Sequence, residues 1–96
     1  MSSSAGPALY QSILWEVNKS KSTSEFSVYV VKHKDLFASG GREALAKSLG
    51  QSENGIENED KLRAVRSLAQ AVSNSSDSEL EMKIIEWGEQ NKPESG

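Results

Sequence analysis

Residues 57–73 carry the clearest periodic pattern in the chain, and this pattern constrains the fold most. Their apolar residues recur at spacings of three and four, which places them on one face of an α-helix. These residues are Leu62, Val65, Leu68, Ala69 and Val72. Glu59 and Asp60 lie in the first turn, where the helix dipole favours anions. The segment is therefore predicted to be a helix that packs one face against a core.

The chain is small, with 96 residues of which 35% are hydrophobic. A core of this size barely offsets the conformational entropy lost on folding, so we expect self-association or a protein partner. Residues 1–6 are expected to form a disordered leader, residues 7–88 a single globular domain, and residues 89–96 a flexible acidic tail.

Cysteine is absent, and neither a signal peptide nor an apolar run of membrane-spanning length is evident. These features predict an intracellular protein, cytoplasmic or nuclear, that makes no membrane contact. The net charge of −3 is unevenly distributed, because cations exceed anions in residues 1–50 and anions exceed cations in residues 51–96. Such asymmetry can orient a partner or a second copy of the chain.

Residues 25–31 form the best strand candidate. They read Glu-Phe-Ser-Val-Tyr-Val-Val, which concentrates β-branched and aromatic residues. In a strand, Phe26, Val28 and Val30 would share one face. A lone strand leaves its backbone groups unpaired, so a ladder partner is required.

Residues 79–87 are the most plausible ladder partner, although their pattern is ambiguous. Leu80, Met82 and Ile84 alternate with charged residues, as in a half-buried strand. Leu80, Ile84 and Trp87 also share one face of a helix. We predict that residues 79–87 form the strand that pairs with residues 25–31.

Two further helices complete the expected fold, one over residues 7–18, where a strand is the alternative, and one over residues 42–49. Gly50 is placed to end the second of these in a left-handed cap. The predicted fold class is α+β, with a central strand 25–31 paired with 79–87 and helices at the N-terminus, 42–49 and 57–73. The alternative is an all-α bundle of four or five helices, in which Ser24 opens a helix carrying Phe26, Val30, His33 and Phe37.

Residues suited to catalysis are few. His33 is the only histidine, and no cysteine or second histidine is present to share a metal ion. Ser39-Gly40-Gly41 lacks the spacing and the lysine of a nucleotide-binding loop. No metal, cofactor or small-molecule substrate is indicated, and we expect the protein not to be an enzyme.

Large aromatic residues are the best candidates for contact with a partner protein. Trp15 and Trp87 serve either as core residues or as interface anchors, and Tyr29 lies on the predicted strand. We assign Trp15, Tyr29 and Trp87 to partner binding. The expected function is a non-catalytic protein–protein interaction module, a small subunit or adaptor that binds through an apolar face with charged rims.

Four lysines provide the alternative function, a nucleic-acid-binding accessory subunit. They are Lys19, Lys21, Lys32 and Lys34. Phosphate binding requires several cations on one face, and two separated pairs satisfy this requirement poorly.

Ser76 and Ser78 are candidate phosphorylation sites, because each has a glutamate three residues downstream.

Overall fold

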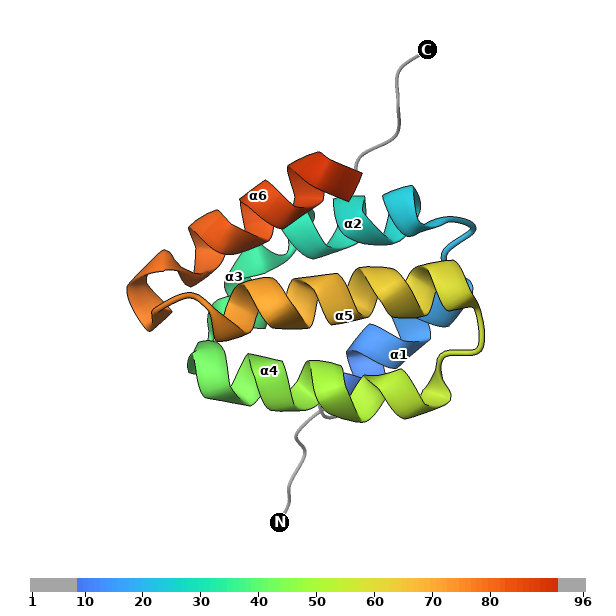
Figure 1. Ribbon diagram of the computed structural model, residues 1–96, viewed down its shortest axis with the longest axis horizontal. Coiled ribbons are helices and arrows are strands. Elements are labelled where there is room, and N and C mark those ends of the chain that lie inside the picture. Colours follow the sequence, from blue (N-terminus) through green and yellow to red (C-terminus); the bar gives the residue numbers. More distant parts are fainter. Residues whose placement is uncertain (1–8, 92–96) are drawn as a thin grey trace.

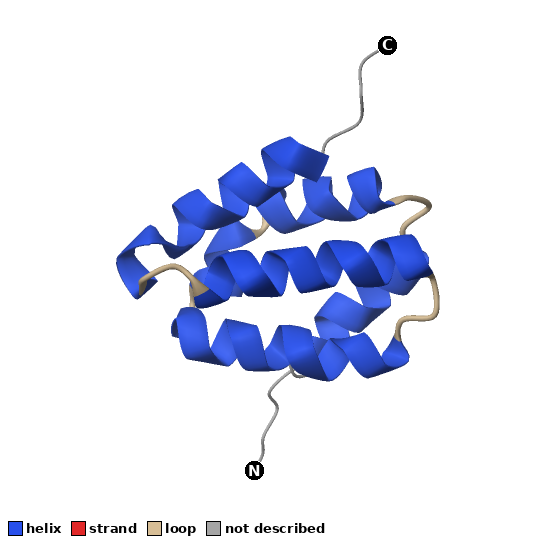
Figure 2. Cartoon of the chain, in the orientation of Figure 1, coloured by secondary structure: helices blue, strands red, loops and turns tan. Residues whose placement is uncertain are grey.

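In the computed structural model, which describes residues 9–91, the chain folds into helices joined by short turns (Figure 2). The elements are α1 (Leu9–Lys19), α2 (Thr23–Lys32), α3 (Lys34–Ala38), α4 (Gly41–Ser52), the 3-10 turn η1 (Glu53–Gly55), α5 (Glu59–Ser73), the 3-10 turn η2 (Asp77–Glu79) and α6 (Leu80–Asn91). No strand occurs within residues 9–91. The expected leader 1–6 lies outside the described residues, as do positions 92–96 of the expected tail.

The α+β prediction is wrong, because residues 25–31 lie in helix α2. Phe26 and Val30 are fully buried, whereas Val28 is 54% exposed. A strand would place all three on one face, but a helix turns the middle residue away from the other two. The all-α alternative gives the correct class, although the described residues contain six α-helices rather than four or five.

The start of α2 shows why a helix forms here despite the β-branched residues. The Ser22 side chain caps the helix by accepting a hydrogen bond from the Glu25 backbone N–H, at 3.2 Å. The Glu25 carboxylate in turn accepts from the Lys21 backbone N–H, at 2.9 Å. A serine followed three residues later by glutamate is a known signature of a helix start, and it satisfies N–H groups that the helix leaves unpaired. The cap therefore lies at Ser22, two residues before the Ser24 of the alternative interpretation.

Residues 79–87 do not form a ladder strand either, since Leu80 begins α6. Leu80, Ile84 and Trp87 are buried, and Met82 is 59% exposed. This pattern follows the helical period and contradicts the alternating one. The helix continues to Asn91.

The remaining helices lie close to their predicted positions. The helix expected over residues 57–73 is present as α5, which begins after Asn58, whose side chain accepts from the Lys61 backbone N–H at 3.0 Å. The helix expected over 42–49 is α4, but it passes through Gly50 and ends at Ser52. Gly50 is therefore not the expected left-handed cap; the only glycine with positive φ in the described residues is Gly41, at the start of α4.

Helix α5 lies at the centre of the arrangement (Figure 1), where it packs between α4 and α6. Helix α1 packs against α4, and α2 packs mainly against α6, to which it runs antiparallel. Every helix contributes to a single apolar core. Its fully buried members include Ile13, Val17, Phe26, Val30, Phe37, Leu45, Leu49, Val65, Leu68, Val72 and Ile84.

Polar contacts fix the ends of helices that lie far apart in the sequence. The Asp77 carboxylate accepts a hydrogen bond from the Arg42 backbone N–H at 2.7 Å and so caps α4 from the turn before α6. The Lys61 ammonium donates to the Ser20 carbonyl and joins the start of α5 to the turn between α1 and α2. None of the helices in residues 9–91 combines the length and apolar character needed to cross a membrane.

Candidate functional site

Most of the exposed large apolar side chains gather on one group of helices. Five such side chains occur in the described residues: Trp15, Val28, Leu36, Met82 and Ile85. Four of the five belong to α2, α3 and α6, which pack against one another. Exposed apolar side chains scattered singly are ordinary, but several on adjoining elements indicate an interaction surface.

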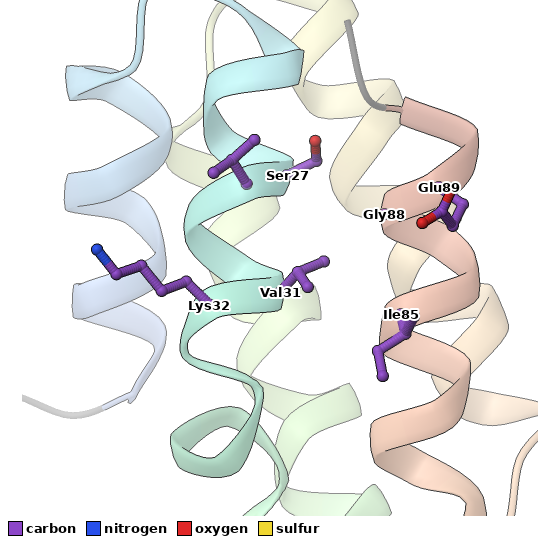
Figure 3. Close-up of a pocket in the computed structure, with 7 residues that line it drawn as sticks. Ser27, Val31, Lys32, Ile85, Gly88 and Glu89 are labelled. Carbon is purple, nitrogen blue, oxygen red and sulfur yellow. The ribbon is translucent and has the colours of Figure 1, made fainter.

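A groove of about 300 Å³ runs between α2 and α6 (Figure 3), and its lining is mainly apolar. Its lining residues are Ser27, Val28, Val31, Lys32, Ile85, Gly88 and Glu89. We call this feature the α2–α6 groove. Val28 and Ile85 are its most exposed apolar side chains, and Ile85 is 38% exposed. Met82 lies one turn before Ile85 on α6 and extends the apolar surface along the same side of that helix.

Polar groups border the groove on both helices. Figure 3 shows Glu89 near the end of α6, whereas the Lys32 side chain leaves α2 on the side away from α6. The buried Ser27 hydroxyl lies 2.8 Å from the Ser24 carbonyl and 3.3 Å from the Asn91 carbonyl, to which it can donate. Because this hydroxyl is a donor to backbone carbonyls, it is not activated as a nucleophile. The groove is thus suited to holding apolar side chains, with Glu89 as the acidic residue of its lining.

Gly88 allows the two helices to approach closely enough to form the floor of the groove. A Cβ atom at Gly88 would lie 2.3 Å from Cγ2 of Val31. Valine has little rotamer freedom in a helix, so this contact is not easily relieved. Gly50 in α4 is also helical, yet a Cβ atom there would meet nothing within 4 Å.

Gly88→Ala is therefore expected to destabilise the protein, and Gly50→Ala to stabilise it. Overpacking costs about 1–3 kcal/mol, which the higher helix propensity of alanine offsets by about 1 kcal/mol. We expect a net loss of up to about 2 kcal/mol for Gly88→Ala and a gain of about 0.5–1 kcal/mol for Gly50→Ala. Urea denaturation measures both, and Val31→Ala in the Gly88→Ala background should recover part of the loss. Equal gains from the two alanines would contradict the close approach.

Of the three aromatic residues assigned to partner binding, the structure brings two together. Trp15 on α1 and Tyr29 on α2 line a second cleft of about 430 Å³. Trp15 is 67% exposed, the largest exposed fraction among the large apolar residues described. The Tyr29 ring packs against His33, with ring centroids 4.5 Å apart. Trp15 and Tyr29 are thus accessible neighbours, although they come from different helices.

Trp87 lies elsewhere, in the core, and is 2% exposed. Its indole N–H donates to the Ala64 carbonyl of α5 at 3.2 Å, and its ring forms a T-shaped pair with Phe26 at 6.1 Å between centroids. A side chain so placed contacts the protein's own helices and presents almost no surface to a partner.

The four lysines are divided between the two ends of α2. Lys19 ends α1 and Lys21 precedes α2, whereas Lys32 ends α2 and Lys34 begins α3. A helix of 10 residues spans roughly 15 Å, so the pairs are separated by about that length. Lys19 also lies 3.9 Å from the Glu16 carboxylate. The four cations do not converge as a phosphate-binding site would require.

Ser76 and Ser78 are exposed in the turn before α6, and their hydroxyls lie 3.2 Å apart. Ser76 is the residue before η2, and its side chain makes no capping hydrogen bond there. Both hydroxyls are therefore accessible to an enzyme, and phosphorylation at either position remains a prediction.

His33 lies at the junction of α2 and α3 and caps neither helix through its side chain. Within residues 9–91, no group of three or more His, Asp or Glu side chains is placed to hold a metal ion.

Burial, and then the charge of Glu16, raise the pKa of the Tyr29 phenol. The resulting stabilisation is complete below the ordinary tyrosine pKa of 10.0 and is lost as the pH rises through the folded-state value.

Sequence reasoning did not single out Val31, Ile85 and Gly88, which help to form the α2–α6 groove. A usable signal was nonetheless present, because Val28 and Met82 are apolar at positions that a helical period turns away from the core.

Comparison with protein-family models, curated proteins and solved structures found no match for this chain.

Proposed function

We propose that this chain is a non-catalytic protein–protein interaction module that binds an apolar helix of a partner protein in the α2–α6 groove. The observation that carries the proposal is the exposure of Val28 and Ile85 beside an apolar groove between two antiparallel helices. A partner that covers these side chains removes their apolar surface from water, which favours association.

A helix is the segment best suited to this groove. Two neighbouring helices present ridges and a groove between them, into which the side chains of a third helix can pack. Peptide helices that bind in this way use apolar anchors spaced three, four or seven residues apart.

The alternative function, a nucleic-acid-binding accessory subunit, has less support. The lysine pairs lie at opposite ends of α2 and present no continuous basic face. The exposed apolar residues of α2 and α6 would also have no role in binding phosphate groups.

Site-specific photo-crosslinking tests the proposal. A benzophenone side chain is placed at Ile85, which lines the groove, or at Gln70, which is exposed on α5. In native lysate, we expect a discrete protein adduct at Ile85 that is absent at Gln70. Val28→Asp, introduced with the label at Ile85, should weaken capture by about tenfold or more, since it buries an uncompensated charge in the interface.

A matched Gln70→Glu variant should retain capture, because the added charge lies away from the groove. Equal capture from both label positions, or capture that is insensitive to Val28→Asp, would contradict binding at the α2–α6 groove. Light scattering of the purified protein then shows whether the occupant is a second copy. A dimer abolished by Val28→Asp would assign the groove to self-association.

A further inference from the structure

A second surface, separate from the α2–α6 groove, lies between α1 and α2. Its lining residues are Gln11, Ser12, Trp15, Glu16 and Tyr29. Gln11 and Trp15 are four residues apart, as are Ser12 and Glu16, so the four α1 residues lie on one side of that helix. Tyr29 approaches from α2 and completes the cleft. We call it the Trp15–Tyr29 cleft.

Two aromatic rings form walls of this cleft. Trp15 is held by its own helix but is largely exposed, so most of its ring surface is available. Tyr29 is positioned by His33 on one side and by Phe37, whose ring centroid lies 6.1 Å away. Among the described residues, the Trp15 and Tyr29 rings both line the cleft but make no ring contact with each other. The space between them therefore stays open to a ligand.

One acidic group, Glu16, belongs to the lining of the cleft. Its side chain is only 18% exposed, so water screens its charge incompletely. The charge acts on Tyr29 as well, as the shared lining implies. Lys19 is the cation nearest to it in the structure, at 3.9 Å, a distance beyond a hydrogen bond. Lys32 extends from α2 toward α1 (Figure 3), but it forms no ion pair with Glu16 in the described residues.

From this arrangement we infer that the Trp15–Tyr29 cleft binds the guanidinium group of an arginine side chain on a partner protein. The faces of indole and phenol rings attract cations, and a planar guanidinium stacks on such faces better than an ammonium group does. Its N–H groups point outward in the plane, where the Glu16 carboxylate and the Ser12 hydroxyl can accept hydrogen bonds. A volume of about 430 Å³ accommodates a side chain of this size.

The inference is tested by NMR titration of the full chain with N-acetyl-arginine methylamide. The indole N–H signal of Trp15 reports on the cleft, and that of the buried Trp87 serves as the internal reference. A Trp15→Phe variant assigns the two signals. We expect a saturable shift of the Trp15 signal alone. The citrulline analogue, which has the same shape without the charge, should bind about tenfold more weakly.

Substitutions in the lining separate charge from shape. Glu16→Gln should weaken arginine binding by about three- to tenfold, whereas Glu57→Gln, the same change at an exposed position outside the cleft lining, should leave it unaltered. Lys19→Gln removes the competing cation and should strengthen binding by about twofold.

Each of three outcomes would overturn the inference: no saturable shift of the Trp15 signal, equal binding of the citrulline analogue, or no effect of Glu16→Gln. The result is independent of the proposed groove function. Val28→Asp, which disables the α2–α6 groove, should leave the arginine titration unchanged.

Discussion

Trp87→Ala is expected to lower the free energy of unfolding by about 3–5 kcal/mol. The Trp87 side chain is 2% exposed and packs between α5, through the Ala64 carbonyl, and α2, through the Phe26 ring. Its removal leaves a cavity where three helices meet. Small domains are stable by about 5–15 kcal/mol, so the loss is a large fraction of the total. Urea denaturation followed by far-UV circular dichroism measures it.

Trp15→Ala provides the matched control, because it is the same substitution at a residue that is 67% exposed. It should change the free energy of unfolding by no more than about 0.5 kcal/mol. Trp87→Phe removes the indole N–H donor but keeps an aromatic ring in the core. It should therefore cost less than Trp87→Ala. Similar losses for Trp15→Ala and Trp87→Ala would show that the two tryptophans are not placed as described.

Leu68→Ala is expected to cost about 2–5 kcal/mol. Leu68 is fully buried on the inner face of α5, the helix that packs between α4 and α6. Deleting three heavy atoms there removes packing contacts within the buried core. Thermal and urea denaturation should both show the loss.

Arg66 lies two residues before Leu68, on the outer face of α5, and Arg66→Ala is the matched control. The Arg66 Nε lies 3.3 Å from the Glu53 carboxylate, and this arginine is exposed, so its removal should cost no more than about 0.5 kcal/mol. The pair of variants therefore tests the orientation of α5 within the fold. Equal effects would mean that the wrong face of α5 has been placed inward.

The helix α5 could be predicted from the sequence because several local signals agree there. Its apolar period, its acidic first turn and its length all indicate one structure, and each signal arises from residues within the helix itself. Only its start was displaced, from residue 57 to Glu59, because the Asn58 side chain caps the helix. The prediction that α4 stops at Gly50 was wrong. A glycine forms a left-handed cap only where its backbone adopts positive φ, and Gly50 does not.

Residues 25–31 were predicted as a strand because two periods coincide over short distances. Phe26 and Val30 share a face at either period, so their burial does not distinguish a helix from a strand. The residues that do distinguish them, Val28 and Met82, are apolar and yet exposed, and this imitated an alternating strand. The strand propensity of β-branched residues was outweighed by the Ser22 cap and by packing against α6.

The candidate sites depended on tertiary structure more than the helices did. Aromatic content indicated Trp15, Tyr29 and Trp87 as partner-binding residues, but nothing local shows that Trp15 and Tyr29 meet across α1 and α2 while Trp87 is buried. The α2–α6 groove requires two helices separated by about fifty residues to run antiparallel, with Gly88 admitting Val31. Helix period and capping are properties of neighbouring residues, and the sequence alone determines them. The pairing of helix faces is settled by the packing of the whole core, so only the tertiary structure decides which exposed side chains become neighbours.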